Sequence, residues 1–286
     1  MTYGRADDGF ITYRTFRFGS KGQIYRGHPP ESPEPIAACI GAAQTFGRYV
    51  EYPYPELLEA RLAQPVDNFG TGGAGPDFFA NESDVIAACN RAKVVVVQVM
   101  SGRSVSNRFF TVNPLRNARI HAISAELYEL AGDPSLGKFV FAHDLLRFLA
   151  IRHPRAFAEV IGDARQRWIA SYSVLMERLT PPKILFWFST RPPEGDSMKF
   201  PQLIDEATLE SVLSTADLFV SCVSQAGMPQ SLLRNGRAVL TGGRGQPRTS
   251  NTYYPSPEMH QLAADSLAAP ITRLAERSST RRATSS

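Results

Sequence analysis

The sequence KVVVVQVM at residues 93–100 is the feature that most constrains how this chain can fold. Four consecutive valines make a strand apolar on both sides, whereas a strand with one solvated face alternates apolar and polar residues. Burial on both faces is typical of a central parallel strand with helices above and below it. The chain is therefore expected to contain an α/β domain organised around this strand.

Other apolar runs predict the rest of the sheet, at residues 36–40, 65–69, 183–189 and 217–223. Helical spacing is found between them, at residues 53–63, 81–91, 120–130, 143–151, 156–179, 206–214 and from 257 to about 275. Alternating strands and helices with right-handed crossovers predict a flavodoxin-like three-layer sandwich with a mainly parallel five-stranded sheet. Ligands bind such sheets at the carboxyl ends of the strands.

The sequence divides the chain into three parts. Residues 1–35 combine β-forming residues around a GSKG turn with a proline-rich connector, which predicts an N-terminal flap or strand pair. Residues 36–275 form the α/β domain, with Ser256 capping the last helix and Pro257 at its first position. Residues 276–286 are polar and basic and are expected to be a disordered tail.

Charge and hydropathy disfavour several classes of partner. The formal net charge is +4, but the segment at residues 273–282 has four arginines and one glutamate, and so holds three of those charges (4 − 1 = 3). The body is close to neutral, so nucleic-acid binding is not expected. The apolar runs are too short to span a membrane and the N-terminus lacks the layout of a secretory signal, which predicts a cytoplasmic protein. Cys39, Cys89 and Cys222 lie in or beside apolar runs, so buried thiols are expected rather than a metal site.

Four motifs follow the predicted strands in the order found in one known superfamily. IGAAQTFG lies at residues 40–47, NFGTGG at 68–73, SGRS at 101–104 and PEMH at 257–260. This pattern resembles the conserved blocks of the SGNH, or GDSL-type, hydrolases. More narrowly, IGAAQTFGRYVEYPYPELL, SNRFF and YYPSPEMH resemble an uncharacterised bacterial domain family of unknown function.

The resemblance implies site residues, with important departures. The nucleophilic serine of the hydrolases falls on Ala43, whose methyl group cannot attack a carbonyl, and the aspartate that orients the histidine falls on Pro257. The asparagine of the third block falls near Ser104 or Asn107. His260 stands where the superfamily has its base. Because a catalytic triad works as a unit, an ordinary serine esterase is disfavoured.

Candidate functional residues gather at the predicted strand ends. His260 is the candidate general base, and Thr45 is either a substitute nucleophile or a structural hydroxyl. Backbone amides of the glycine cluster at residues 70–75 offer donors to an oxyanion or phosphate, and Arg103 suits a carboxylate, sulfate or phosphate. The proposed substrate-binding residues are Gly41, Gln44, Gly70, Gly73, Arg103, Ser104, Ser106 and Asn107. Arg191, Arg244 and Arg248 are candidates for an anion-binding rim, and His28, His121, His143 and His153 are expected to be structural or surface residues.

Two functions remain open. The first is an SGNH-like hydrolase or group transferase without the usual serine, acting on a decorated carbohydrate or lipid, with His260 as base. The alternative is a non-catalytic SGNH-like protein that binds a glycan or small metabolite. Both imply a small-molecule or glycan partner, and the sequence identifies neither a cofactor nor an oligomeric state.

Overall fold

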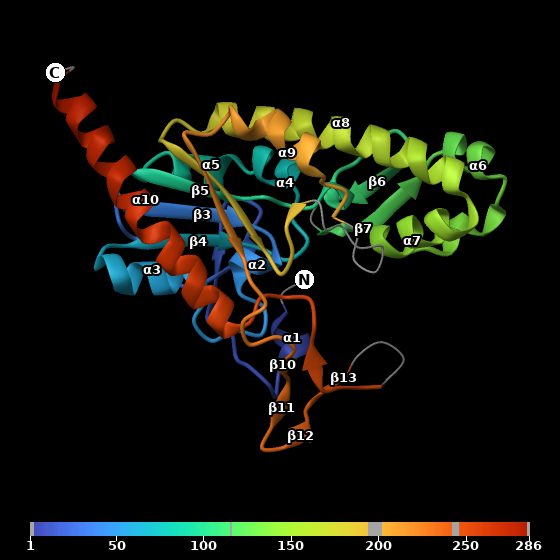
Figure 1. The fold of residues 1–286 in the computed structure, drawn as a ribbon, viewed down its shortest axis with the longest axis horizontal. Helices are drawn as coiled ribbons and strands as arrows, with labels where there is room; N and C mark the ends of the chain where they lie inside the picture. Colours follow the sequence, from blue (N-terminus) through green and yellow to red (C-terminus); the bar gives the residue numbers. More distant parts are fainter. Residues whose placement is uncertain (1–2, 115, 194–201, 242–245, 285–286) are drawn as a thin grey trace.

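The computed structural model describes residues 3–114, 116–193, 202–241 and 246–284, and its centre is a five-stranded parallel sheet (Figure 1). The strands are β3 (Ala37–Gly41), β4 (Val66–Gly70), β5 (Val94–Gln98), β8 (Lys183–Ser189) and β9 (Leu218–Val223), in the spatial order β4-β3-β5-β8-β9. The valine-rich β5 is the middle strand and is buried along its whole length. The predicted α/β class and parallel five-stranded sheet are confirmed.

Helices cover both faces of the sheet and so complete three layers (Figure 1). One face packs against α3 (Tyr54–Leu62) and α10 (Pro257–Thr284). The other packs against α4 (Pro76–Ala80), α5 (Ser83–Cys89), α8 (Pro154–Arg178) and α9 (Glu206–Leu213). Each of the two helical layers buries one apolar cluster against the sheet. This packing fixes the positions of the strand ends.

A lobe is inserted between β5 and α8. It comprises η1 (Gly102–Ser104), β6 (Phe110–Asn113), β7 (Arg116–Ile123), α6 (Ala125–Ala131), η2 (Pro134–Lys138) and α7 (Ala142–Arg152). The helix predicted over residues 120–130 is wrong in its first part, because Ile120 and Ile123 lie in β7 and pair with β6. Apolar residues at 120, 123, 127 and 130 imitate helical spacing across the boundary, and the helix begins only where the Ser124 hydroxyl accepts the Leu127 N–H at 3.2 Å.

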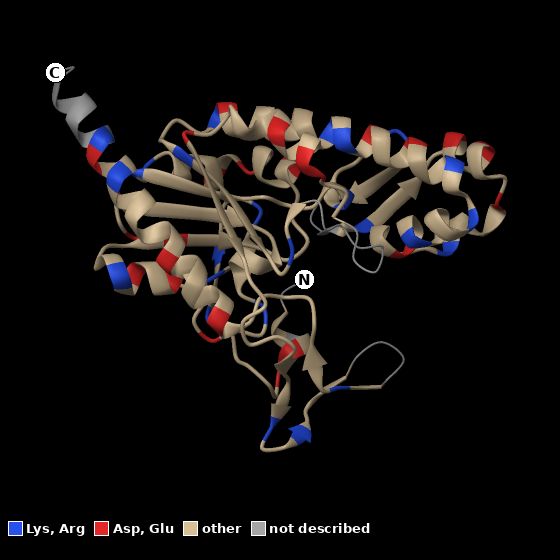
Figure 2. Ribbon diagram, in the orientation of Figure 1, with Lys and Arg blue, Asp and Glu red and all other residues tan. Residues whose placement is uncertain are grey.

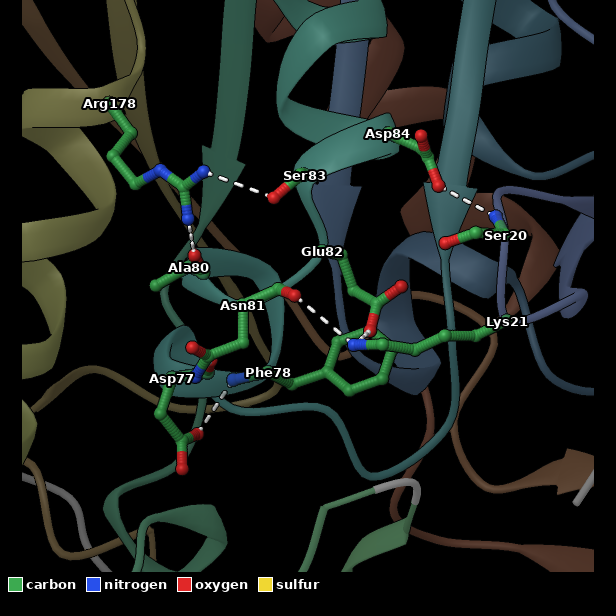
Figure 3. Close-up of polar contacts among 10 residues, drawn as sticks. All are labelled: Ser20, Lys21, Asp77, Phe78, Ala80, Asn81, Glu82, Ser83, Asp84 and Arg178. Carbon is green, nitrogen blue, oxygen red and sulfur yellow. Dashed lines mark hydrogen bonds and ion pairs between the residues drawn. The ribbon is translucent and has the colours of Figure 1, made fainter.

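The N-terminal segment contains α1 (Gly4–Asp7), followed by an antiparallel pair of β1 (Thr15–Phe18) and β2 (Gln23–Arg26). The turn of this pair is held against the α4–α5 junction (Figure 3). The Ser20 N–H donates to Asp84 at 2.6 Å, and the Lys21 ammonium lies 2.6 Å from a Glu82 oxygen. Arg178 of α8 donates to the same junction from the other side (Figure 3).

The chain between β9 and α10 forms three short antiparallel pairs near α1 (Figure 1). The strands are β10 (Gln230–Ser231), β11 (Leu233–Arg234), β12 (Arg237–Ala238), β13 (Leu240–Thr241), β14 (Pro247–Arg248) and β15 (Ser250–Asn251). The predicted cap of α10 is present, since the Ser256 hydroxyl accepts the Met259 N–H at 3.2 Å. The helix runs on to Thr284, so residues 276–284 are helical where a disordered tail was expected. Alanine, arginine and glutamate in this stretch favour the helix, while residues 285–286 lie outside the described part.

Acidic and basic residues are interspersed along the outer helices α8 and α10 (Figure 2). Within the described residues, none of the helices combines the length and apolar character needed to cross a bilayer. Cys39, Cys89 and Cys222 are buried, as expected from their apolar neighbourhoods.

Candidate functional site

A cavity of about 550 Å³ opens at the carboxyl edge of the sheet. Its floor comes from three strand ends: residues 42–44 after β3, residues 72–74 after β4, and residues 98–104 at the end of β5 and in η1. The volume is within the range of about 300–1,000 Å³ that is usual for ligand sites. The cavity lies at the edge where the sequence predicts a ligand site, because parallel strands end at one edge.

Segments distant in sequence supply the walls. The inserted lobe contributes Ala118 and Arg119 from β7, and Phe141 and His143 from the start of α7. Residues 248 and 250–254, between the last short strands and α10, form a second wall, and Tyr3 and Ala6 of the N-terminal segment lie beside them. The cavity is thus assembled from the sheet, the lobe and both ends of the chain.

Four of the predicted site residues line this cavity: Gln44, Gly73, Arg103 and Ser104. Ala43, at the place of the hydrolase nucleophile, also lines it. Gly73 has a φ of +80°, a left-handed conformation that favours glycine, and it lies against Ala118 of the lobe. These residues bring together the loops after β3, β4 and β5.

Gly41 and Gly70 lie outside the cavity lining and serve close packing. A Cβ atom on Gly41 would lie 2.2 Å from the Thr45 hydroxyl, and one on Gly70 would lie 2.2 Å from the Phe46 nitrogen. Both positions therefore need glycine so that α2 (Ala43–Phe46) can fold back over the ends of β3 and β4.

Thr45 is fully buried beneath the cavity floor. Its hydroxyl lies 2.9 Å from the side-chain oxygen of Gln98, which also accepts the Ala42 N–H at 2.9 Å. The Tyr54 hydroxyl lies 3.1 Å from the same Thr45 oxygen. The threonine hydroxyl is thus engaged in a buried polar cluster and does not face the cavity.

His260 is also fully buried and lies outside the cavity lining. Its Nδ1 accepts the Tyr54 N–H at 3.0 Å, and its ring stacks on the Tyr54 ring and meets Phe188 edge-on. Tyr54 begins α3, and the first N–H groups of a helix have no partner within the helix. The imidazole supplies the missing acceptor, which explains why it points into the core between α3 and α10.

Thr45 and His260 are consequently not brought together. Tyr54 lies between them, with its hydroxyl directed to Thr45 and its backbone amide directed to His260. The candidate general base is therefore packed in the core and does not line the cavity. Burial, with a smaller contribution from the Arg26 guanidinium, lowers the pKa of His260 to about 3.

Ser106 and Asn107 shape the entry to the lobe. The Ser106 hydroxyl accepts the Val112 N–H at 3.0 Å, and the Asn107 side-chain oxygen accepts the N–H groups of Phe109 and Phe110 at 3.0 and 3.1 Å. These bonds hold the turn that leads into β6. Neither side chain lines the cavity, so the hydrogen-bonding surface predicted for residues 101–107 is restricted to its first part.

Four arginines line the cavity, and its described lining contains no aspartate or glutamate. Arg48 forms a two-point ion pair with Asp7, at 3.0 and 2.9 Å. Arg103 donates to the Tyr253 hydroxyl at 2.9 Å, and Arg248 donates to the Tyr49 hydroxyl at 2.9 Å. The Arg119 guanidinium lies 5.3 Å from the centre of the Phe141 ring.

Of the predicted anion-binding rim, Arg248 lines the cavity and Arg191 does not, while Arg244 lies outside the described residues. Sequence reasoning missed Arg48, Arg119 and the tyrosines at 3, 253 and 254, since no spacing links them along the chain. It also treated His143 as structural or surface, although His143 lines the cavity. Burial lowers the pKa of His143, with Asp144 opposing the shift and Arg103 adding to it.

Comparison with known proteins yields one family and several distant structural matches. The family model described as Domain of unknown function (DUF6473) matches residues 1–275. A search of curated proteins finds no match.

A G-D-S-L family lipolytic protein from Desulfitobacterium hafniense is 13% identical with a TM-score of 0.38, covering 83% of this chain and 99% of that one. A family two carbohydrate esterase from Clostridium thermocellum, solved with cellohexaose, is 10% identical with a TM-score of 0.41, covering 89% and 68%. An acetylxylan esterase from Geobacillus stearothermophilus, solved as a catalytic mutant, is 15% identical with a TM-score of 0.42, covering 84% and 94%.

Proposed function

We propose, from the premise that this chain belongs to the DUF6473 family, that it is an SGNH-like binding protein. It holds a small molecule or a glycan fragment in the cavity at the sheet edge and does not hydrolyse it through a serine and a histidine. One observation carries this proposal: Ala43 lines the cavity at the place of the nucleophile, while His260 lies outside it. The two positions at which the resemblance implies a nucleophile and a base therefore do not supply a reacting pair to this cavity.

The state of His260 argues further against a hydrolase or group transferase that uses it as base. The lone pair of Nδ1 is occupied by the Tyr54 N–H, so a neutral ring carries its proton on Nε2. Such a ring has no free lone pair with which to take a proton from water or from an acceptor hydroxyl. A general base must also reach the proton that it abstracts, and this ring is fully buried.

Binding is tested by filling the cavity. Ala118→Phe places a ring in the cavity wall, whereas Ala122→Phe adds the same ring at an exposed position of the same strand, β7. We expect ligands found by a thermal-shift screen of sugars and metabolites to stabilise the wild type and Ala122→Phe, and not Ala118→Phe. Ligands that stabilise all three proteins equally bind elsewhere, and this result would contradict the proposal.

The absence of latent esterase chemistry is tested by rebuilding the hydrolase motif. The triple variant Ala42→Asp, Ala43→Ser, Pro257→Asp restores the residues of the superfamily pattern. We expect it to remain at the background rate on p-nitrophenyl acetate, because the new hydroxyl would face a cavity from which His260 is absent. Ala43→Ser alone is the matched control. Turnover by the triple variant well above that of the single variant would show that His260 can reach the site, and would restore the enzyme hypothesis.

A further inference from the structure

The cavity lining has a charge asymmetry that the outer helices α8 and α10 lack. Its described lining has four arginines and no carboxylate, whereas both signs are interspersed along the outer helices (Figure 2). Arg48 is neutralised by Asp7, which lies behind the wall. Arg103 lies in η1, where it donates to the Tyr253 hydroxyl, and the other two arginines are Arg119 in β7 and Arg248 in β14.

Arg119 and Arg248 are the informative pair. Among the described residues, each guanidinium group contacts an aromatic side chain: Arg119 lies over the Phe141 ring, and Arg248 donates to the Tyr49 hydroxyl. These aromatic groups orient the guanidinium groups without cancelling their charge. Neither arginine forms an ion pair with a carboxylate among the described residues. Both positive charges line the same cavity, so an anion bound there is attracted to each of them.

Three tyrosines, at residues 3, 253 and 254, also line the cavity. Tyr253 and Tyr254 meet edge-to-face with their centres 4.9 Å apart, and Tyr254 continues to Tyr3 at 6.4 Å. The Tyr254 hydroxyl accepts from Arg48 at 3.1 Å, which fixes the direction of that ring. Aromatic side chains in the same lining as arginines offer apolar contact to a ring and charged donors to a group attached to it.

We propose that the ligand of this cavity is a ring compound of saccharide size that bears an anionic group, either phosphate, sulfate or carboxylate. Arg119 and Arg248 bind the anionic group, and the tyrosines at 3, 253 and 254 contact the ring. This inference rests on the proposed binding function and adds the chemical class of the ligand. Arginine suits all three anions because its planar group donates two parallel hydrogen bonds to oxygens of one anion.

The experiment compares charged and neutral forms of one sugar. Glucose, glucose 6-phosphate, glucose 6-sulfate and glucuronate are titrated by calorimetry into the wild type, Arg119→Gln, Arg248→Gln, Ala118→Phe and the control Arg237→Gln. Arg237 is exposed in β12 and lies outside the cavity lining, so its variant makes the same charge change elsewhere. Melting temperatures without ligand establish that each variant is folded.

We expect at least one charged sugar to bind the wild type and Arg237→Gln more tightly than glucose does. Each cavity arginine variant should weaken this binding by about tenfold or more, since hydrogen bonds to charged groups are the stronger class. The charged sugar that binds most tightly identifies the anionic group. Added salt should weaken the binding of the charged sugar and leave any binding of glucose unchanged.

The two proposals fail in different ways. If glucose binds as tightly as its charged forms, or if Arg119→Gln and Arg248→Gln bind like the wild type, the anionic ligand is wrong and the binding function stands. If neither these sugars nor the wider metabolite screen bind in a manner that Ala118→Phe abolishes, the binding function itself is wrong, and the inference about its ligand is overturned with it.

Discussion

Arg48→Met is expected to lower the free energy of unfolding by about 3 kcal/mol. The substitution removes both bonds to Asp7, whose side chain is only 1% exposed, and so leaves a carboxylate buried without its countercharge. Burial alone lowers the pKa of Arg48, but the hydrogen bonding to Asp7, together with the nearby Tyr254 and Tyr3 and the Asp7 charge, more than offsets this, and the net direction is upward. Since Arg48 itself keeps 14% of its side chain exposed, we expect the lower end of the range for buried pairs.

The loss should extend to the cavity wall. The Arg48 guanidinium lies over the rings of Tyr3, Tyr49 and Tyr254, at 4.2, 4.6 and 5.0 Å from their centres. It thereby joins the N-terminal segment, the loop after α2 and the segment before α10 at one point. Arg48→Met should therefore weaken the binding of any ligand in the cavity as well as the stability of the fold.

Urea unfolding of a double-mutant cycle with Asp7→Asn measures the coupling between the two side chains. Asp7→Asn combined with Arg48→Met removes the stranded charge, so the double variant should be more stable than the sum of the two single losses predicts. If the loss of the double variant equals the sum of the two single losses, or if Arg48→Met costs less than about 1 kcal/mol, the ion pair is effectively solvated.

The sheet and the place of the cavity could be predicted from the sequence because both follow from local patterns. Runs such as the valines of β5 indicate burial on both faces, and burial on both faces indicates a parallel sheet. The strand ends then share one edge, so the loops at residues 42–44, 72–74 and 98–104 had to meet. No long-range information was needed for that step.

The walls of the cavity could not be predicted in this way. Arg119 reaches the cavity because β7 pairs with β6, and this hairpin was hidden by an apolar spacing that also fits a helix. Arg248 and Tyr254 reach it through short strands whose sequences lack a clear period. Tertiary packing decides such positions, and the sequence shows only which residue types are present.

His260 illustrates a third situation, in which the position in the chain was informative and the orientation was not. The motif PEMH predicted that His260 lies in the first turn of the last helix, and α10 begins at Pro257 as expected. The direction of its ring depends on which backbone donor lacks a partner, and here that donor is the Tyr54 N–H. A sequence motif does not contain this information.

The burial of His260 leads to a strong pH dependence of stability. Its pKa is lowered to about 3 in the folded chain, against about 6.5 in an unfolded chain. Between these two values the unfolded chain binds the proton and the folded chain does not, so acid favours unfolding. The contribution of His260 is therefore fully present above about pH 6.5 and is lost as the pH falls towards 3. From pH 7 to pH 4 we expect a loss of about 3 kcal/mol from this residue alone.

His260→Asn isolates the effect, because the asparagine oxygen can accept the Tyr54 N–H in place of Nδ1 but does not titrate. Urea unfolding at intervals from pH 7 to pH 4, followed by tryptophan fluorescence, gives the free energy of unfolding of both proteins. Groups other than His260 titrate in both and cancel in the difference. We expect the wild type to lose about 3 kcal/mol relative to His260→Asn over this range. A difference that stays constant to within about 1 kcal/mol would mean that the folded chain protonates the ring readily, and the imidazole would then have access to water and to the chemistry that its burial excludes.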